Sequence, residues 1–290
     1  MLKSFPAKIL LLGEYTILNG SKALAVPYLE LSGQWSLSPL NEEHAKFSHA
    51  SLEAFLEHRS EQYLDYPRLK KDIQNGLWFD SSIPQGFGLG SSGALIAALF
   101  ETYGDRQGSL MEDKLSLARL EDYFHGSSSG IDPLVSLIQK PLLIHSFEEV
   151  EIYSEKLNLR GFFLLNTNKS RNTGPLVSIY QEKMKDPEFK HGCAEVLSRE
   201  VNFAIDSILK NDRSHLFHHL WLISKFQWEY FPEMIPTQMR SLWLKGLESG
   251  DYILKLCGAG GGGFILGYSD KLTPMEKIKI FGPHEFSPLG

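Results

Sequence analysis

This 290-residue chain has only two cysteines and lacks any long run of apolar residues. Cys193 and Cys257 do not have the spacing of zinc ligands, and two cysteines in a chain of this length do not favour a disulfide scaffold. No segment approaches the roughly 18 apolar residues of a membrane helix, and the run 9–12 is too short for the core of a secretory signal. We therefore expect a soluble cytoplasmic protein.

The sequence also lacks a concentration of basic residues. The formal net charge is −6, and no segment gathers Lys and Arg as a polyanionic partner requires. We expect neither nucleic acid nor a membrane as partner, and either a monomer or a homodimer. At 42% hydrophobic residues the chain can bury a large core. A boundary between Ser146 and Gly161 divides it into expected domains at 1–155 and 156–290.

The hydrophobic patterns predict strands and helices in uneven order, which indicates an α+β fold rather than a doubly wound sheet. Expected strands are 3–12, 23–37, 160–166, 252–256 and 264–268; expected helices are near 51–76 and at 93–103, 110–124, 173–185 and 199–230. His215 and His219 share a face of the last helix, so a metal pair is conceivable. The mixed apolar and charged pattern of this helix fits an amphipathic packing helix better.

The stretch from Pro84 to Ala94, PQGFGLGSSGA, runs directly into an apolar helical segment. Alternating glycines let backbone amides approach a ligand, and a helix N-terminus favours anions, so the stretch predicts a phosphate cradle. A dinucleotide fingerprint would follow a buried strand, but residues 80–85 form a poor strand. A Walker loop needs Gly-Lys, and no lysine occurs between Lys71 and Lys114. The alternatives are a different phosphate loop and a turn that binds nothing.

A second glycine run, 258–263, lies between the two expected strands near the C-terminus. Glycine in regular secondary structure lowers stability by about 1 kcal/mol relative to alanine, because its backbone loses more conformational entropy on folding. A purely structural turn would therefore rarely use so many glycines. Close approach to a ligand, or to the first glycine loop, is the better interpretation.

Two carboxylates, Glu121 and Asp132, flank a Ser/Gly turn at 126–130. Phosphoryl transfer needs one group to hold Mg²⁺ on the polyphosphate and another to orient the attacking hydroxyl, with a cation near the transferred group. Lys8, within the apolar run 5–12, is the candidate cation. The structural alternative for Lys8 is an edge-strand lysine that faces water.

Together these segments resemble the GHMP kinase family. Three motifs carry the resemblance: the start of the chain from Pro6-Ala7-Lys8 to Gly20, the loop 84–94, and 255–263, which is similar to the family's K-x-T-G-A-G-G-G-G. Within the family, mevalonate kinases match best. Their H-G-x-x-S-G-x-D segment corresponds to residues 125–132 and their R-[NS]-T segment to residues 171–173.

The resemblance implies an ATP-dependent kinase with a ribosomal protein S5 domain 2-like N-terminal domain, which would be the ATP-binding and catalytic one, and a ferredoxin-like C-terminal domain. It makes Asp132 the catalytic carboxylate and Lys8 its partner, with Ser92 and Glu121 as Mg²⁺ ligands. Implied nucleotide-binding residues are Gly86, Gly88, Leu89, Gly90, Ser91 and Ser92. Implied acceptor-binding residues are Glu14, Tyr15, Arg171, Thr173, Gly258, Ala259 and Gly260.

Three residues depart from the mevalonate kinase pattern. Tyr15 replaces the usual histidine, as in phosphomevalonate kinases; Cys257 replaces a threonine and Gly93 an alanine. We expect mevalonate as the acceptor, with phosphomevalonate or a sugar as the alternative. An alternative of another class is a nucleotide-binding regulatory protein without catalysis.

Overall fold

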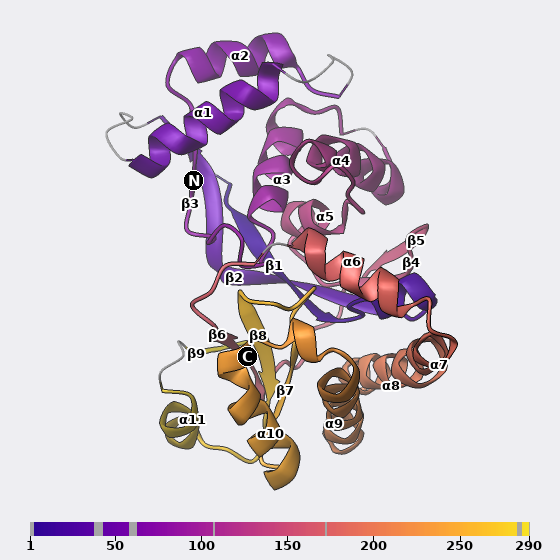
Figure 1. The fold of residues 1–290 in the computed structure, drawn as a ribbon. Helices are drawn as coiled ribbons and strands as arrows, with labels where there is room; N and C mark the ends of the chain where they lie inside the picture. The colour runs from indigo at the N-terminus through magenta and orange to yellow at the C-terminus, as the bar shows by residue number, and fades with distance from the viewer. Residues whose placement is uncertain are drawn as a thin grey trace. The chain divides into compact units, whose positions relative to one another are not determined.

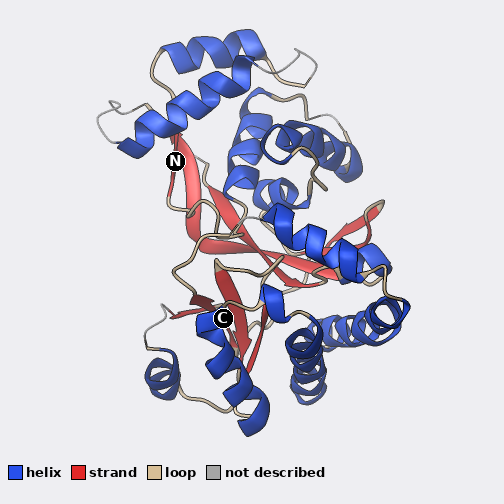
Figure 2. Ribbon diagram, in the orientation of Figure 1, coloured by secondary structure: helices blue, strands red, loops and turns tan. Residues whose placement is uncertain are grey.

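The computed structural model describes residues 3–37, 43–57, 63–106, 108–171, 173–282 and 286–289. The fold is α+β, as predicted, and divides into two compact units (Figures 1 and 2). Unit 1 comprises residues 1–9, 26–85 and 89–141; unit 2 comprises 10–25, 86–88 and 142–290. The predicted domains at 1–155 and 156–290 stay a prediction. Within the described ranges, no helix combines the length and apolar character needed to cross a bilayer.

The first sheet has the strand order β1-β2-β4-β5, with β3 also paired to β2. Its strands are β1 (Phe5–Leu12), β2 (Ala23–Ser36), β3 (Trp78–Ser81), β4 (Leu142–Ser146) and β5 (Glu149–Ile152). The long strands β1 and β2 each run through both units. Within unit 1, β2 and β3 are antiparallel in the register Gly33↔Ser81. A β-carbon on Gly33 would lie 2.3 Å from the Phe79 ring, so this glycine lets the ring pack across the pair.

The described residues of unit 1 also form the helices α1 (Glu43–Glu57), α2 (Tyr66–Gln74), α3 (Ser91–Tyr103), α4 (Leu110–His125) and α5 (Ile131–Ile138). Helices α3, α4 and α5 lie against one another (Figure 1). Helix α3 is apolar on most sides and is largely buried. Helix α4 begins with a capping box between Ser109 and Glu112 and ends at Gly126, whose φ of 74° suits glycine.

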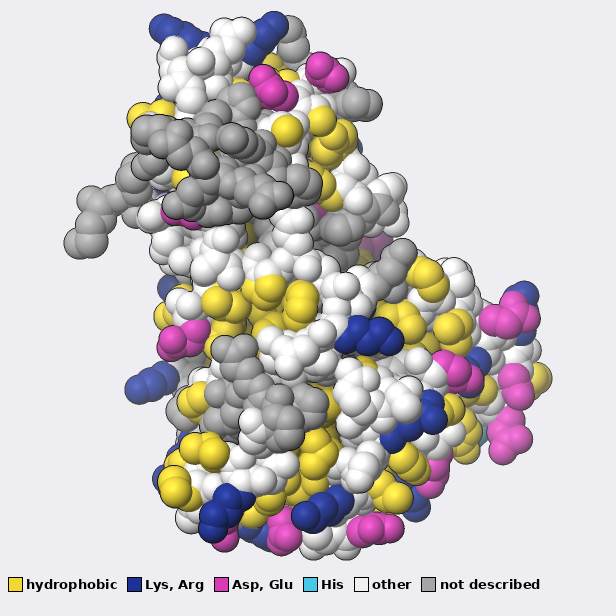
Figure 3. All heavy atoms as spheres, turned by 60° about the vertical axis from the view of Figure 1, so that its left-hand side comes forward, with side chains coloured by type: hydrophobic (Ala, Val, Ile, Leu, Met, Phe, Trp, Pro, Cys, Tyr) yellow, Lys and Arg dark blue, Asp and Glu magenta, His cyan; other side chains and the backbone are white. Residues whose placement is uncertain are grey.

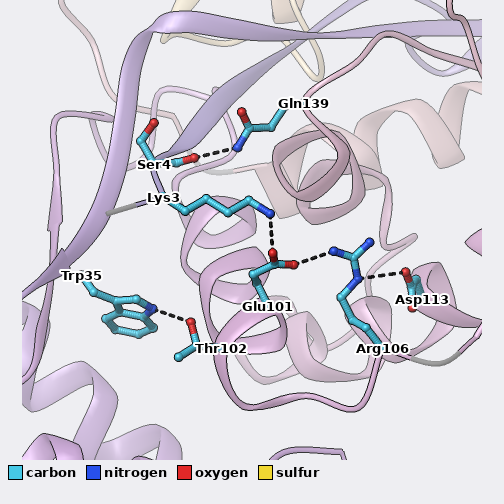
Figure 4. Close-up of polar contacts among 8 residues, drawn as sticks. All are labelled: Lys3, Ser4, Trp35, Glu101, Thr102, Arg106, Asp113 and Gln139. Atoms are coloured by element: carbon cyan, nitrogen blue, oxygen red, sulfur yellow. Dashed lines mark hydrogen bonds and ion pairs between the residues drawn. The ribbon is translucent and has the colours of Figure 1, made fainter. Parts of the chain in front are cut away.

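The start of the chain is tied to the helices of unit 1 by polar contacts (Figure 4). The Nζ of Lys3 lies 2.5 Å from Oε1 of Glu101 on α3, and Glu101 also pairs with Arg106. Gln139, at the end of α5, donates to the carbonyl of Ser4 over 2.7 Å. These contacts fix the beginning of β1, the strand that carries Lys8.

Unit 2 contains a second, antiparallel sheet with the order β7-β8-β6-β9. Its strands are β6 (Phe162–Asn166), β7 (Ile253–Leu256), β8 (Phe264–Tyr268) and β9 (Phe286–Pro288). The glycine run 258–263 joins β7 to β8, in the register Leu256↔Ile265, as predicted. The α-helices are α6 (Thr173–Lys183), α7 (Pro187–His191), α8 (Ser198–Leu209), α9 (Arg213–Tyr230), α10 (Arg240–Ser249) and α11 (Pro274–Phe281).

Unit 2 also has a π-helical stretch, η2 (Gly192–Leu197), and the short 3₁₀ turns η1 (Thr16–Asn19), η3 (Pro232–Met234) and η4 (Thr237–Met239). On the face drawn in Figure 3, the acidic and basic side chains of the described residues are interspersed rather than sorted by sign.

Two of the expected helices are interrupted. The helix expected over 199–230 is broken between α8 and α9, because Asn211 adopts a left-handed φ of 55° and the Asp212 side chain caps α9. The helix expected near 51–76 is interrupted at residues 63–65, where the Asp65 side chain caps α2. Strand β3 was not expected; it overlaps the stretch 80–85 only at its last two residues, so the expectation of a poor strand there is consistent with the structure.

Candidate active site

Lys8 and Asp132 form an ion pair in unit 1, with Nζ 2.8 Å from Oδ1. The Lys8 side chain is 9% exposed, so the alternative of a lysine facing water does not hold, whereas the Asp132 side chain is 35% exposed. Strand β1 also donates the Lys8 backbone N–H to the carbonyl of Leu89, over 2.9 Å. Asp132 lies in the first turn of α5, where the helix dipole favours a negative charge.

Glu121, on α4, is buried beside this pair. Its Oε1 accepts a hydrogen bond from the Ser92 hydroxyl at 3.1 Å, and its Oε2 accepts one from Ser128 at 2.5 Å. Burial, and then the charge of Asp132, raise the pKa of Glu121 to about 7, against the two serine hydrogen bonds and Lys8. The tertiary structure therefore gathers Lys8, Ser92, Glu121 and Asp132 at one place in unit 1.

These oxygen donors fit Mg²⁺. No group of three or more His, Cys, Asp or Glu side chains able to hold a metal occurs in the described parts of the chain. Mg²⁺, however, is commonly bound through one or two carboxylates, with substrate phosphates completing its shell. The buried Glu121 carboxylate beside the Ser92 hydroxyl is such a partial shell.

The histidines of α9 do not form the conceivable metal pair. The Nδ1 of His215 lies 2.7 Å from Asp212, and the Nδ1 of His219 lies 2.8 Å from Glu200. Each ring therefore has its own carboxylate partner, which supports the interpretation of α9 as a packing helix.

The first glycine loop leads into α3. Gly86, Gly88 and Gly90 of this loop have positive φ values of 76°, 77° and 74°. A β-carbon on Gly90 would lie 3.0 Å from Cγ of Lys8 and 3.5 Å from the Asp132 carboxylate. The loop therefore needs glycine here both for its backbone and for its neighbours. Helix α3 then begins at Ser91, so its first backbone N–H groups lie at this end of unit 1.

Arg171 contacts glycine residues of both glycine loops within unit 2. Its backbone N–H donates to the carbonyl of Gly86 at 2.9 Å, and its guanidinium donates to the carbonyl of Cys257 at 2.7 Å. β-carbons on Gly88 and Gly258 would lie 2.0 Å and 2.8 Å from a guanidinium nitrogen. Close approach to Arg171 thus explains both glycines. Within the described part of the chain, the buried Nε of Arg171 has no hydrogen-bond partner, so it retains donor capacity for an anion.

Glu14 is buried in an ion pair with Lys255, whose Nζ also donates to the carbonyls of Leu11 and Leu256. Burial raises the pKa of Glu14 against the opposing effects of Lys255 and of the backbone N–H of Gly258. The pair therefore joins the turn after β1 to the second glycine run. Sequence reasoning missed this role of Lys255, although a lysine in the apolar strand ILKL was a usable signal.

Tyr15, the residue after Glu14, has a positive φ of 61°. Its hydroxyl donates to the carbonyl of Ala259 at 2.9 Å, and its ring stacks on Tyr180 at 4.5 Å. Gly260 is held close to Met234, whose carbonyl would lie 2.6 Å from an added β-carbon. Unit 2 thus gathers Tyr15, Arg171 and the start of the second glycine run.

Part of the R-[NS]-T segment cannot be placed. Asn172 and the side chain of Thr173 lie outside what the structure describes; Thr173 is placed only as the first residue of α6. Ser128 and Tyr180 are further contact residues that sequence reasoning missed. Their partners, Glu121 and Tyr15, are determined by tertiary contacts, and the sequence carries no local signal for them.

A glycine loop that leads into a helix N-terminus, beside a Lys–Asp pair and a buried glutamate, defines an α+β protein equipped to bind phosphate. Residues 51–140 match the family profile described as GHMP kinases N terminal domain. This stretch is therefore similar to the N-terminal domain of GHMP kinases, which are ATP-dependent.

Two named relatives are similar over most of the chain. A mevalonate kinase of Arabidopsis thaliana is 25% identical, with 94% of this chain and 92% of the relative covered. A mevalonate kinase of Pyrococcus furiosus is 26% identical, with 97% and 93% covered.

Solved structures share the fold. L. major mevalonate kinase in complex with R-mevalonate has a TM-score of 0.67 at 14% identity, covering 100% of this chain and 97% of that one. Streptococcus pneumoniae phosphomevalonate kinase has a TM-score of 0.65 at 15% identity, covering 100% of this chain and 98% of that one. Lactococcus lactis galactokinase complexed with galactose has a TM-score of 0.66 at 12% identity, covering 98% of this chain and 92% of that one. The GHMP kinase fold is thereby confirmed, while the three neighbours differ in substrate.

Proposed function

We propose that this protein transfers the γ-phosphoryl group of ATP to an alcohol, with mevalonate as the acceptor. The observation that carries this proposal is the pairing of Lys8 with Asp132 beside the N-terminus of α3. This arrangement provides a carboxylate for the acceptor hydroxyl and a cation for the transferred phosphoryl group, next to backbone amides suited to a polyphosphate. The ATP-binding residues lie in the proposed domain 1–155, and a C-terminal GHMP kinase domain spans 156–290.

In this mechanism the backbone amides of the loop Gly86, Gly88, Leu89, Gly90, Ser91 and Ser92 bind the polyphosphate. Ser92 and Glu121 hold Mg²⁺, which neutralises charge on the phosphates when bound. Asp132 accepts the proton of the acceptor hydroxyl as the hydroxyl oxygen attacks the γ-phosphorus in line, and the bond from the γ-phosphorus to the bridging oxygen breaks to release ADP. Lys8 pairs with Asp132 and offsets the developing negative charge, and transfer is direct, without a covalent enzyme intermediate.

Support for mevalonate comes from the two relatives of that name and from Arg171. A guanidinium suits bidentate binding of a carboxylate, a group that mevalonate carries. Tyr15, Thr173, Gly258, Ala259 and Gly260 complete the proposed acceptor site. Glu14 contributes through its pair with Lys255, which holds the turn that carries Tyr15.

Phosphomevalonate is the second candidate acceptor, and Tyr15 is the residue that favours it. Its phosphate would require additional positive charge, for which Lys169 and Arg171 are available in the same segment. The rival of another class, a regulatory protein that binds nucleotide without turnover, is disfavoured by the intact set Lys8, Ser92, Glu121 and Asp132.

A coupled assay of ADP release tests these alternatives. MgATP is offered with mevalonate, phosphomevalonate, galactose or homoserine, and Asp132→Asn is assayed in parallel. We expect turnover with mevalonate and a loss on the order of 10²-fold or more in the variant. Turnover only with phosphomevalonate would overturn the acceptor assignment, and nucleotide binding without turnover on any acceptor would favour the regulatory alternative.

A further inference from the structure

Glu121 has two oxygens, and each accepts a hydrogen bond from a different serine. Ser92 is among the residues proposed to bind Mg²⁺, but Ser128 is not. In the H-G-x-x-S-G-x-D segment, Ser128 occupies the second variable position, while the serine of the motif is Ser129. The family pattern therefore assigns no task to Ser128.

The Ser128 hydroxyl has a defined orientation. Its oxygen accepts a hydrogen bond from the backbone N–H of Gly130 at 3.0 Å, and it lies 2.5 Å from Oε2 of Glu121. A hydroxyl has a single proton. Since a carboxylate only accepts and an N–H only donates, the proton of Ser128 is directed at Glu121.

The turn that carries Ser128 is itself fixed against α4. Gly126 ends α4 with φ at 74°, and Gly130 begins α5 with φ at 73°. Gly130 lies so close to α4 that an added β-carbon would be 2.3 Å from the carbonyl oxygen of Lys114. This close contact leaves the turn little room to shift, so the Ser128 hydroxyl is held in place when Glu121 changes partners.

We propose that Ser128 is a positioning residue that holds Oε2 of Glu121 and thereby turns Oε1 toward Ser92 and the Mg²⁺ of the nucleotide. This inference rests on the proposed function. Hydrogen bonds from outside the coordination shell commonly orient metal ligands, and their loss weakens metal affinity by about 10- to 100-fold. Without Ser128 the carboxylate would lose the contact that fixes Oε2, and it would bind the ion less well.

The test uses Mn²⁺ as the probe. Binding of Mn²⁺ to the full-length protein with ADP is measured by electron paramagnetic resonance of the free ion, for wild type, Ser128→Ala and Ser127→Ala. Ser127 is the matched control, because it is an exposed serine on the same turn. We expect Ser128→Ala to weaken Mn²⁺ binding by roughly tenfold or more and Ser127→Ala to leave it unchanged.

Two further variants separate positioning from folding. Ser128→Thr keeps the hydroxyl and should restore Mn²⁺ affinity to near the wild-type value. Ser128→Cys keeps the shape but replaces the strong donor with a weak one, so its Mn²⁺ affinity should fall while its thermal midpoint stays near wild type. Among these variants, the Mg²⁺ concentration for half-maximal ADP release should rise as the Mn²⁺ affinity falls.

Equal Mn²⁺ affinities of Ser128→Ala and Ser127→Ala would overturn the role of Ser128, as would a wild type that binds no Mn²⁺ with ADP. The proposed function is tested separately, because Mn²⁺ binding requires no acceptor. A wild type with tight Mn²⁺ binding that depends on Ser128, but without turnover on any acceptor, would uphold Ser128 and refute the kinase proposal.

Discussion

The Nζ of Lys8 lies 2.8 Å from Oδ1 of Asp132, and the lysine is almost fully buried while the aspartate is partly exposed. This difference leaves one side of the Asp132 carboxylate open to a small molecule, while Lys8 pairs with the carboxylate from the other side. The two residues act as a unit, so the effects of removing them should not add.

The first prediction concerns this pair. Lys8→Met and Asp132→Asn should each lower kcat by roughly 10²-fold or more, and the double variant should be little worse than the poorer single variant. The affinity for ATP should stay nearly unchanged in all three, because backbone amides bind the polyphosphate. Steady-state kinetics with the best acceptor provide the measurement, and multiplicative losses in kcat would contradict the prediction.

The second prediction concerns Gly93, which stands where the family has alanine. A β-carbon here would lie 2.9 Å from the backbone of Asp132 and Pro133. Gly93→Ala gains about 1 kcal/mol of helix propensity but overpacks the contact between α3 and α5 by about 1–3 kcal/mol. We expect no net stabilisation and a lower kcat, because the start of α5 must move.

Thermal unfolding and kcat measure this effect. Gly192→Ala is the control, since it also adds a methyl group in a helical segment but meets the Phe226 ring only at 3.3 Å. A Gly93→Ala protein that is more stable than wild type and fully active would show that α5 tolerates the methyl group.

The third prediction concerns the buried pair of Glu14 and Lys255. Lys255→Met or Glu14→Gln alone should lower the free energy of unfolding by about 3–5 kcal/mol, because each leaves the other partner's charge buried without its counter-ion. The double variant Glu14→Leu/Lys255→Met should recover much of the loss. Urea unfolding measures all three; single variants as stable as wild type would show that water reaches the pair.

The fourth prediction concerns pH and the cap of α9. Hydrogen bonds from the Ser214 hydroxyl, the His215 backbone N–H and the His215 ring lower the pKa of Asp212 to about 2 from its usual 3.8. A lowered folded-state pKa stabilises the protein above the unfolded pKa, and this contribution is lost as pH falls from about 4 toward about 2. The difference in thermal midpoint between wild type and Asp212→Ala should therefore be largest above about pH 5 and shrink through that window. A difference that is constant down to the lowest pH would contradict the prediction.

Local elements were the most predictable part of this protein. Strand β1, helix α3 and the β7–β8 hairpin follow from hydrophobic period and glycine placement, which are short-range properties. Prediction failed at the break between α8 and α9, because a left-handed Asn211 leaves little trace in composition. It also missed β3, a four-residue strand that exists through its pairing with β2.

The residues of the candidate site likewise comprise some that local sequence patterns predicted and others that only tertiary contacts revealed. The sequence alone determined the glycine loops, the two flanking carboxylates and the place of Lys8 in an apolar run, because each lies in a recognisable local pattern, whereas the burial of Lys8 was seen only in the structure. Only the tertiary structure decided that Ser128 meets Glu121 and that Glu14 is neutralised by Lys255. Such pairs depend on how turns pack against helices and strands, and a hydroxyl or an ammonium group has several possible partners until packing and burial leave it one.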